Sequence, residues 1–296
     1  MSDVYAGIDQ LVLTEGFAAS AVCDALEVSR SGFYGWRSEE ESRRAAVDQE
    51  LTPEIVDIFW HHRRRYGARR IARELARRGI ACGMTRVARL LKNQGLRAIQ
   101  PKSFAPRTTD SRHALGYDEN LLKDRKAPLR VNEAWVGDIT YVPLAPSRAS
   151  GRFGDLSLLM DLFSRRIVGW DFGLTMDEGL ILGALRRAIR ERQPASGLIH
   201  HTDRGGQYAS GRYRAVLRRA EIRQSMSAAG NCYDNAFMES CFGTIKTELE
   251  LVEYRSSAEA LRELSNYIHY YNVERLHSSL GYVSPAEFET QPNPQK

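Results

Sequence analysis

Three acidic residues occupy positions where a carboxylate needs a partner. Asp138 lies inside the apolar segment 135–144, where an acid is costly unless it is paired or binds a metal. Asp203 follows a short apolar segment directly, and ligands usually bind at the carboxyl ends of strands in α/β sheets. Glu239 lies in a predicted helix further along the chain. The three residues are therefore candidates for a joint carboxylate site that binds a metal ion.

The predicted helix around Glu239 carries two further polar residues at helical spacing. Asn235 precedes Glu239 by four residues and Lys246 follows it by seven, so all three side chains share one face. A carboxylate with a cation two turns away suits a metal ligand beside a contact with a DNA phosphate. We therefore predict that Lys246 and Asn235 bind DNA.

Each acid also has an ordinary structural explanation. Asp138 could be a salt-bridged core acid, Asp203 a turn residue and Glu239 an acid on a helix surface. Their joint occurrence on these elements favours a shared site. Asp161, which ends a predicted strand before a hairpin, is instead expected to support that turn.

The histidines next to Asp203 leave two alternatives open. His200 and His201 could lie near the site, but a histidine at the end of a strand more often has a structural role.

The elements that position these residues form a predicted α/β unit. Alternation and β-branched content predict three strands in meander order, followed by alternating helices and strands. The strands are expected at residues 135–144, 156–162, 167–172, 197–201 and 222–226, and the helices at 178–190, 208–220, 234–251 and 258–271. This order describes a mixed sheet flanked by helices.

The N-terminal part is predicted to be helical. A helix over residues 17–26, a short turn and a second helix through Trp36 suggest a helix-turn-helix. Residues 38–50 are interpreted as a linker or an exposed helix. Three short helices are expected over residues 51–96, with Gly79 and Gly95 ending the second and third.

Positive charge is concentrated in one segment of the 296-residue chain. The whole chain carries +5, but residues 61–107 contain 14 Lys and Arg against one acid, Glu74. That segment is therefore +13 and the remainder −8, which is the electrostatic footprint of a protein that binds a phosphate backbone. The predicted DNA contacts in it are Arg63, Arg64, Arg65, Arg69, Arg70, Arg86 and Arg89.

Composition excludes several classes of protein. No run of 18 apolar residues predicts a membrane span, and the first 30 residues do not have the pattern of a secretory signal. The four cysteines include no CxxC pair, so they are interpreted as reduced thiols. We therefore expect a cytoplasmic protein.

Several motifs together resemble a known family. They are VGDITYVPL, DLFSRRIVGW, HHTDRGGQYAS, GNCYDNAFMESCFGTIKTELE and YYNVERLHSSLGYVSPAEF, with AVCDALEVSRSGFYGW and YGARRIARELARRGI towards the N-terminus. The sequence resembles the transposases of bacterial insertion sequences that have a retroviral-integrase-like catalytic core, specifically the product of the second reading frame, OrfB. The resemblance covers nearly the whole chain.

The resemblance implies a fold and an arrangement of domains. The expected catalytic core is an α/β, ribonuclease-H-like mixed sheet, preceded by small all-α helix-turn-helix modules. The expected parts are a helix-turn-helix-like module (1–45), a basic helical DNA-binding module (46–100), a linker (101–128) and the integrase core with a C-terminal helical extension (129–292).

The resemblance also implies an activity. Asp138, Asp203 and Glu239 correspond to a catalytic, metal-binding DDE triad, and Lys246 to the basic residue after the glutamate. The enzyme would be a DDE polynucleotidyl transferase that cleaves and joins DNA at the terminal inverted repeats of an insertion element, giving DNA integration and recombination.

The expected cofactor is Mg²⁺, for which Mn²⁺ would substitute. Two Mg²⁺ ions about 3.5–4 Å apart stabilise the attacking and leaving oxygens of phosphodiester transfer, and Mg²⁺ prefers carboxylate oxygens. Asp138 would bridge both ions, while Asp203 and Glu239 would each hold one.

The sequence leaves the assembly and the exact reaction open. We expect a homo-oligomer on DNA, with a first-frame protein (OrfA) as partner or fusion. The rival functions are a DNA-binding regulator without catalysis and a structure-specific nuclease of the same fold. The C-terminal signature from Tyr270 to Phe288 either covers the edge of the site or binds DNA, or packs on the core through Tyr271, Leu280, Tyr282 and Phe288.

Overall fold

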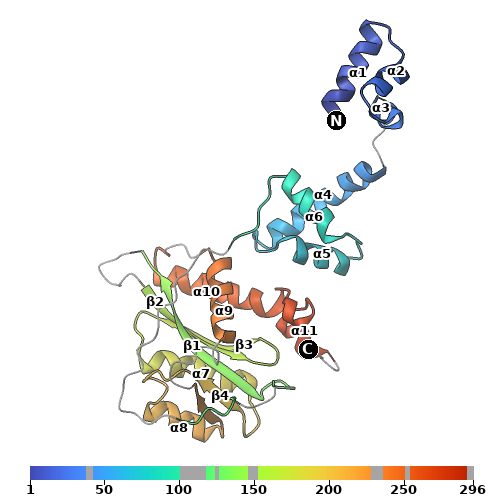
Figure 1. Cartoon of the computed structure of the whole chain (residues 1–296). Helices are drawn as coiled ribbons and strands as arrows, with labels where there is room; N and C mark the ends of the chain where they lie inside the picture. Colours follow the sequence, from blue (N-terminus) through green and yellow to red (C-terminus); the bar gives the residue numbers. More distant parts are fainter. Residues whose placement is uncertain are drawn as a thin grey trace. The chain divides into compact units, whose positions relative to one another are not determined.

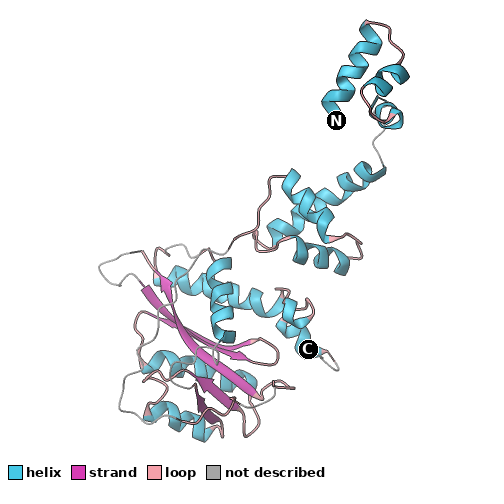
Figure 2. Ribbon diagram, in the orientation of Figure 1, coloured by secondary structure: helices cyan, strands magenta, loops and turns pink. Residues whose placement is uncertain are grey.

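The computed structural model describes residues 1–37, 43–100, 118–123, 127–145, 153–227, 236–250 and 254–291. Contacts within the chain divide it into two units, Met1–Ala98 and Ile99–Lys296 (Figure 1). The described part of the first unit contains helices, whereas the second combines a sheet with helices (Figure 2). Within these ranges, no helix has both the length and the apolar character needed to cross a bilayer.

The first three helices enclose a small apolar core. They are α1 (Ser2–Thr14), α2 (Ala19–Ala25) and α3 (Arg30–Arg37), and they bury Ile8, Ala19, Cys23 and Phe33. The predicted pair of helices joined by a short turn is confirmed as α2 and α3. Helix α1 completes the core, because Ile8 is its buried residue.

Residues 43–93 form three more helices, matching the three predicted over residues 51–96. They are α4 (Arg43–His61), α5 (Ala68–Arg77) and α6 (Met84–Asn93). Gly79 and Gly95 follow α5 and α6 with φ of +81° and +66°, a left-handed conformation that glycine adopts without steric cost. Of the segment left open as linker or exposed helix, residues 43–50 are helical and residues 38–42 lie outside the described ranges.

The second unit contains a five-stranded mixed sheet. Its strands are β1 (Ala134–Pro143), β2 (Phe153–Asp161), β3 (Ile167–Gly173), β4 (Ile199–Thr202) and β5 (Arg223–Met226). The order is β3-β2-β1-β4-β5, with β1, β2 and β3 antiparallel and β4 and β5 parallel to β1. The predicted meander followed by parallel strands is confirmed.

Helices cover both faces of this sheet. α7 (Glu178–Arg192) and α8 (Gly211–Arg219) lie on one side, and α9 (Ala236–Glu248) and α10 (Ser257–Val273) on the other (Figure 1). A short 3-10 helix (Ser278–Leu280) and α11 (Pro285–Thr290) follow α10. An apolar core lies between the sheet and the α7–α8 side and includes Trp135, Leu159, Ile181 and Tyr213.

The turn between β2 and β3 is built around Asp161, which is fully buried. Its Oδ1 accepts hydrogen bonds from the N–H groups of Phe163 and Ser164, both at 2.9 Å, and its Oδ2 accepts one from the N–H of Asn132 at 2.6 Å. These bonds satisfy a carboxylate that burial would otherwise penalise. The prediction that Asp161 supports the turn is confirmed.

Candidate active site

Asp138 and Asp203 lie side by side at the sheet. The parallel register of β1 and β4 pairs Val136 with His201, so two further residues along each strand bring Asp138 next to Asp203. Neighbouring strands are about 4.8 Å apart. Both carboxylates are half-buried. Two acids from segments far apart in the sequence therefore share one place at the end of β4.

Local backbone bonds orient both carboxylates. The N–H of Ile139 donates to Oδ1 of Asp138 at 2.8 Å, and the N–H of Gly205 donates to Oδ1 of Asp203 at 2.9 Å. The second bond is an Asx turn, the structural alternative considered for Asp203. A Cβ at Gly205 would come within 2.8 Å of Gln207 Oε1 and 3.0 Å of Asp203 Oδ1, so a side chain there would crowd the Asp203 carboxylate. The hydrogen bond from Gly205 to one oxygen of Asp203 does not prevent this carboxylate from binding a ligand.

The face of β1 that carries Asp138 is the face covered by α9. Side chains alternate along a strand, and Trp135 and Ile139 pack into the core on the α7–α8 side. Asp138 therefore points to the opposite side, where α9 contacts β1. This topology brings the helix that carries Glu239 and Lys246 to the same side of the sheet as Asp138 (Figure 1).

Lys246 is the α9 residue whose charge acts on Asp138. The side chain of Lys246 is half-buried, and burial lowers its pKa, while the Asp138 carboxylate acts in the opposite direction. Glu239 is exposed and lies two helical turns before Lys246 on the same face. The structure thus brings Lys246 close to Asp138 and places Glu239 on the same, exposed face of α9.

The predicted set is therefore only partly assembled. Within the described ranges, no three His, Cys, Asp or Glu side chains lie close enough together to hold a metal ion. Asn235, predicted to share the face of Glu239, lies outside the described residues.

The two histidines beside the site are buried structural residues. Nε2 of His200 hydrogen-bonds the Tyr213 hydroxyl at 2.6 Å, and Nδ1 of His201 hydrogen-bonds Oγ of Ser225 at 2.8 Å. Burial lowers the pKa of His200 to about 3, helped by the neighbouring His201. The His200 ring also lies against Gly137, where a Cβ would come within 2.8 Å of its Cε1. These side chains pack β4 against its neighbours, and the His200 ring is uncharged at neutral pH.

A buried ion pair holds the end of α9 against the segment after α10. Arg275 is 5% exposed and Glu248 is 7% exposed. Nη2 of Arg275 donates to Oε1 of Glu248 at 2.7 Å, and Nε donates to Oε2 at 2.9 Å. The hydroxyl of Tyr267 donates to the same carboxylate at 2.9 Å. Arg275 thus fixes the helix that carries Lys246 and Glu239, a role that the sequence reasoning did not assign to it.

The start of α9 has its own anchor in the β2–β3 turn. The Arg165 guanidinium carbon lies 3.8 Å from the centre of the Phe237 ring, and Phe237 stands two residues before Glu239. A cation this close to an aromatic face is attracted to it. One turn further along α9, Sγ of Cys241 donates a weak hydrogen bond to the Tyr271 hydroxyl at 3.8 Å.

The C-terminal signature packs on the core, so the second of its two alternatives is confirmed. Tyr271, Leu280 and Phe288 are buried, and Phe288 packs against Phe163. The side chain of Asn272 bonds both backbone groups of Ile167 at 2.9 Å, which ties α10 to the edge strand β3.

The basic helices α5 and α6 present arginines in two different settings. Arg69, Arg73 and Arg77 are exposed and recur every four residues along α5, opposite its buried residues Ile71 and Leu75. The spacing of Arg73 and Arg77 in the sequence already contains this signal, although they were not among the predicted contacts. The regular stripe makes this face of α5 a candidate for contacts with a phosphate backbone.

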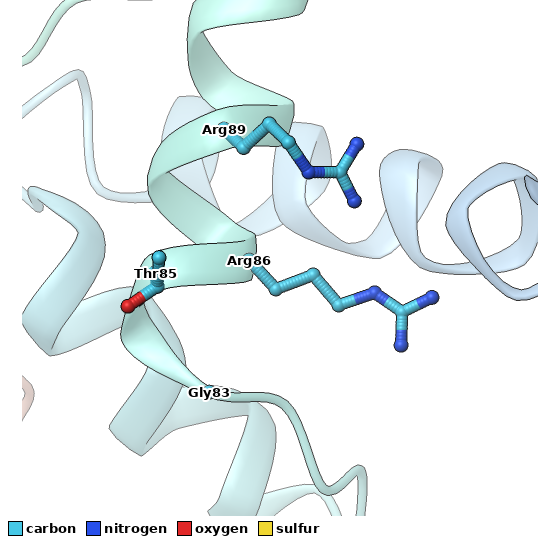
Figure 3. A pocket seen from close by; sticks show the side chains of 4 residues that line it. All are labelled: Gly83, Thr85, Arg86 and Arg89. Carbon is cyan, nitrogen blue, oxygen red and sulfur yellow. The ribbon is translucent and has the colours of Figure 1, made fainter. Parts of the chain in front are cut away.

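Arg86 and Arg89 of α6 instead form ion pairs with Asp48 of α4. Figure 3 shows both side chains extending to the same side of α6, beside a pocket that they line with Gly83 and Thr85. Nε of Arg86 donates to Asp48 Oδ1 at 2.6 Å, and Arg89 donates to Asp48 Oδ2. The two arginines thus link α6 to α4, and their predicted DNA contacts stay a prediction.

The predicted arginines before α5 lie around the end of α4. Arg63 and Arg64 have positive φ of 49° and 62°, and their N–H groups bond the Trp60 and Phe59 carbonyls that close the helix. Arg65 follows them in the same turn, and the Arg70 guanidinium stacks 5.6 Å from the centre of the Tyr66 ring. Their predicted DNA contacts likewise remain untested.

Models of known protein families match residues in both units. Residues 128–232 and 220–285 match two models described as integrase core domain, and residues 46–104 match an HTH-like domain. Together with the strand order, these matches confirm the predicted α/β, ribonuclease-H-like core with a helical N-terminus.

Curated relatives align over almost the whole chain. An uncharacterised 31 kDa protein of insertion element IS600 from Shigella sonnei is 40% identical over 90% of this chain and 97% of its own length. The transposase InsF of insertion sequence IS3A from Escherichia coli K12 is 38% identical over 93% of this chain and 95% of its own length.

The solved structures that are similar to this chain include two of viral integrases. An intasome of simian T-cell lymphotropic virus, in complex with a PP2A regulatory subunit, has a TM-score of 0.46 at 16% identity, covering 82% of this chain and 76% of the other. The HTLV-2 integrase catalytic core in complex with magnesium has a TM-score of 0.40 at 18% identity, covering 54% and 97%. On the strength of its full-length relatives, the chain belongs to the family of insertion-sequence transposases that includes InsF of IS3.

Proposed function

We propose that this chain is a DDE polynucleotidyl transferase that cleaves and joins DNA at the terminal inverted repeats of an insertion element. The observation that carries the proposal is the parallel register of β1 and β4, which brings Asp138 of β1 beside Asp203 just after β4, with α9 packed on β1. Membership in a transposase family supports the reaction class.

The two aspartates fit a divalent cation of the kind that this chemistry uses. Adjacent carboxylates that are half-buried and oriented by backbone N–H groups offer hard oxygen donors, which Mg²⁺ and Mn²⁺ prefer. When bound, Mg²⁺ would stabilise negative charge on the attacking and leaving oxygens. We propose Asp138 and Asp203 as ligands and Glu239 as the third carboxylate, which has to approach them as the site assembles.

The side chains around this pair have separate tasks. The positive charge of Lys246, set beside Asp138, suits a contact with a DNA phosphate. The glycine turn after Asp203 keeps the backbone compact at the site. Asn235 is proposed as a further DNA contact.

The reaction needs no covalent bond between protein and DNA. In the first step, a water oxygen attacks a phosphodiester at the end of the element and releases its 3′-OH. In the second, that 3′-OH attacks a phosphodiester of the target, forming one P–O bond as another breaks and a target 3′-OH leaves. Both steps are displacements at phosphorus, so a single site can perform them in turn.

The helical modules are proposed to hold the DNA. A stripe of arginines along α5 matches a phosphate backbone in sign and in regular spacing. Assembly as a homo-oligomer on paired ends, a first-frame partner, and a location at the bacterial nucleoid in the cytoplasm all remain predictions of this proposal.

Strand transfer tests the proposal directly. A 3′-OH oligonucleotide carrying the element's end is incubated with plasmid and Mg²⁺ or Mn²⁺, using wild type, Asp138→Asn and Glu239→Gln. We expect wild type to join the ends and both variants to bind DNA without joining it. Glu191→Gln, which changes an exposed acid in the last turn of α7, is the matched control and should join normally.

The outcomes also separate the rival functions. A wild type that binds but neither cuts nor joins, even with the first-frame protein added, makes the chain a regulator. A wild type that cuts branched DNA without joining makes it a nuclease. If the Glu239→Gln variant joins DNA at the wild-type rate, Glu239 is not part of the catalytic site.

A further inference from the structure

Tyr208 lies in the turn that connects Asp203 to α8. Its N–H donates to the Gly205 carbonyl at 3.0 Å, and its own carbonyl accepts a hydrogen bond from Nε2 of Gln224 at 2.7 Å. The side chain is 2% exposed, and its ring centre lies 5.4 Å from that of Tyr213. Backbone bonds and packing therefore fix this residue closely.

The hydroxyl of Tyr208 is buried without a hydrogen-bond partner among the described residues. The neighbouring Tyr213 is equally buried, but its hydroxyl bonds His200 at 2.6 Å. An unsatisfied buried hydroxyl destabilises a fold, whereas phenylalanine would fill the same space without that penalty. Packing alone does not explain a tyrosine at this position.

The position of the residue points to the paired aspartates. Tyr208 follows Asp203 by five residues, in the turn whose Gly205 N–H bonds that carboxylate. Ile139, the residue after Asp138, packs against the cluster that contains Tyr208, so the Tyr208 ring lies on the opposite face of β1 from the Asp138 side chain and Asp203 is the nearer partner along the chain. Burial, together with the charges of Asp138 and Asp203, holds the pKa of Tyr208 well above its usual range, so the hydroxyl keeps its proton.

We propose that Tyr208 is a positioning residue of the Asp138–Asp203 site. Without the cation its hydroxyl has no partner among the described residues; with the cation bound, it would donate a hydrogen bond to a carboxylate oxygen of Asp203, directly or through one water molecule, and so fix an oxygen that holds the divalent cation. Outer partners of this kind orient the groups that bind a metal, and their removal typically weakens metal affinity 10- to 100-fold. The inference rests on the proposed function, because it assigns Tyr208 to the same site.

Tyr208→Phe in the full chain separates this role from packing. Without divalent cations, the variant should unfold at a higher temperature than wild type, because it loses only an unsatisfied hydroxyl. Its Mg²⁺ titration, followed as the rise in unfolding temperature with added Mg²⁺, should need about 10-fold more Mg²⁺ for half of the full effect. Strand transfer should show the same shift in Mg²⁺ requirement, with a smaller change in rate at saturating Mg²⁺.

Tyr213→Phe is the matched control. It removes a hydroxyl from the same cluster, but one that bonds His200. It should lower the unfolding temperature and leave the Mg²⁺ requirement unchanged. The two tyrosines are thus expected to give opposite results in both measurements.

Two results would overturn the role of Tyr208. One is a Tyr208→Phe variant that needs the same Mg²⁺ concentration as wild type. The other is a Tyr208→Phe variant that unfolds at a lower temperature without metal, because its hydroxyl would then have a structural partner. A wild type that shows neither a Mg²⁺ effect nor strand transfer would instead overturn the proposed function, and this inference with it.

Discussion

Replacing Arg275 by methionine tests whether the buried ion pair holds α9 in place. The substitution leaves the carboxylate of Glu248, which is 7% exposed, without the Arg275 cation, while the hydrogen bond from Tyr267 remains. Removing one partner of a buried pair typically destabilises a protein by about 3–5 kcal/mol. In a unit of this size, each kcal/mol lowers the unfolding temperature by roughly 2–4 °C, so a decrease of about 10 °C is expected.

The matching double variant makes the prediction specific. Glu248→Met with Arg275→Met removes both charges and fills the space with apolar atoms, a change that is often close to neutral. We expect the double variant to be more stable than Arg275→Met alone. Urea unfolding of wild type, both single variants and the double variant gives the coupling free energy.

Two results would refute this reasoning. The first is an Arg275→Met variant that is destabilised by less than about 1 kcal/mol, which is typical of exposed pairs. The second is a double variant whose destabilisation equals the sum of those of the two single variants, because the pair would then contribute nothing as a pair.

Three further sets of substitutions probe the arginine stripe of α5, the packing of α7 and the buried histidine. Replacing Arg69, Arg73 and Arg77 by alanine should weaken DNA binding in proportion across sequences and reduce the slope of log affinity against log salt by about 0.9 for each phosphate that is no longer neutralised, as measured by fluorescence anisotropy; an unchanged slope would remove α5 from the interface. Gly169→Ala should prevent α7 from packing on β3, because the new Cβ would lie 2.4 Å from the Ala184 carbonyl oxygen; a wild-type unfolding temperature would contradict this close approach. The pKa of His200 is about 3 in the fold and about 6.5 when unfolded, so its stabilising effect is complete above pH 6.5 and falls by about 1.4 kcal/mol per pH unit below it; His200→Gln should flatten this slope in urea unfolding between pH 6 and 4, and an equal slope would contradict the burial of a neutral ring.

The strands of the sheet and the two candidate aspartates could be predicted from the sequence. Alternation in segment 135–144 and the short apolar segments after it identified the strands, because side-chain periodicity and turn residues are local signals. Asp138 was expected inside a strand and Asp203 just after another strand, and the joint site was predicted from these positions together with Glu239. The parallel register of β1 and β4 then sets how closely they approach.

Contacts between segments far apart in the sequence could not be predicted from it. The bonds of Asp48 to Arg86 and Arg89 join α4 to α6 across about 40 residues, and charge counting alone assigned both arginines to DNA. The spacing of Glu239 and Lys246 predicted that they share one face of α9. That spacing does not determine which turn of the helix packs beside the two aspartates. The unpartnered hydroxyl of Tyr208 likewise depends on packing that no periodicity encodes.

The anchors of α9 have a consequence for how the chain is made. Asp138, Asp203 and Glu239 emerge from the ribosome before Arg275, whose ion pair with Glu248 fixes the end of α9. A nascent chain, or one cut short before Arg275, already contains every proposed ligand but lacks the bonds that fix the end of α9. The proposed site therefore stays without this anchor until synthesis has passed Arg275.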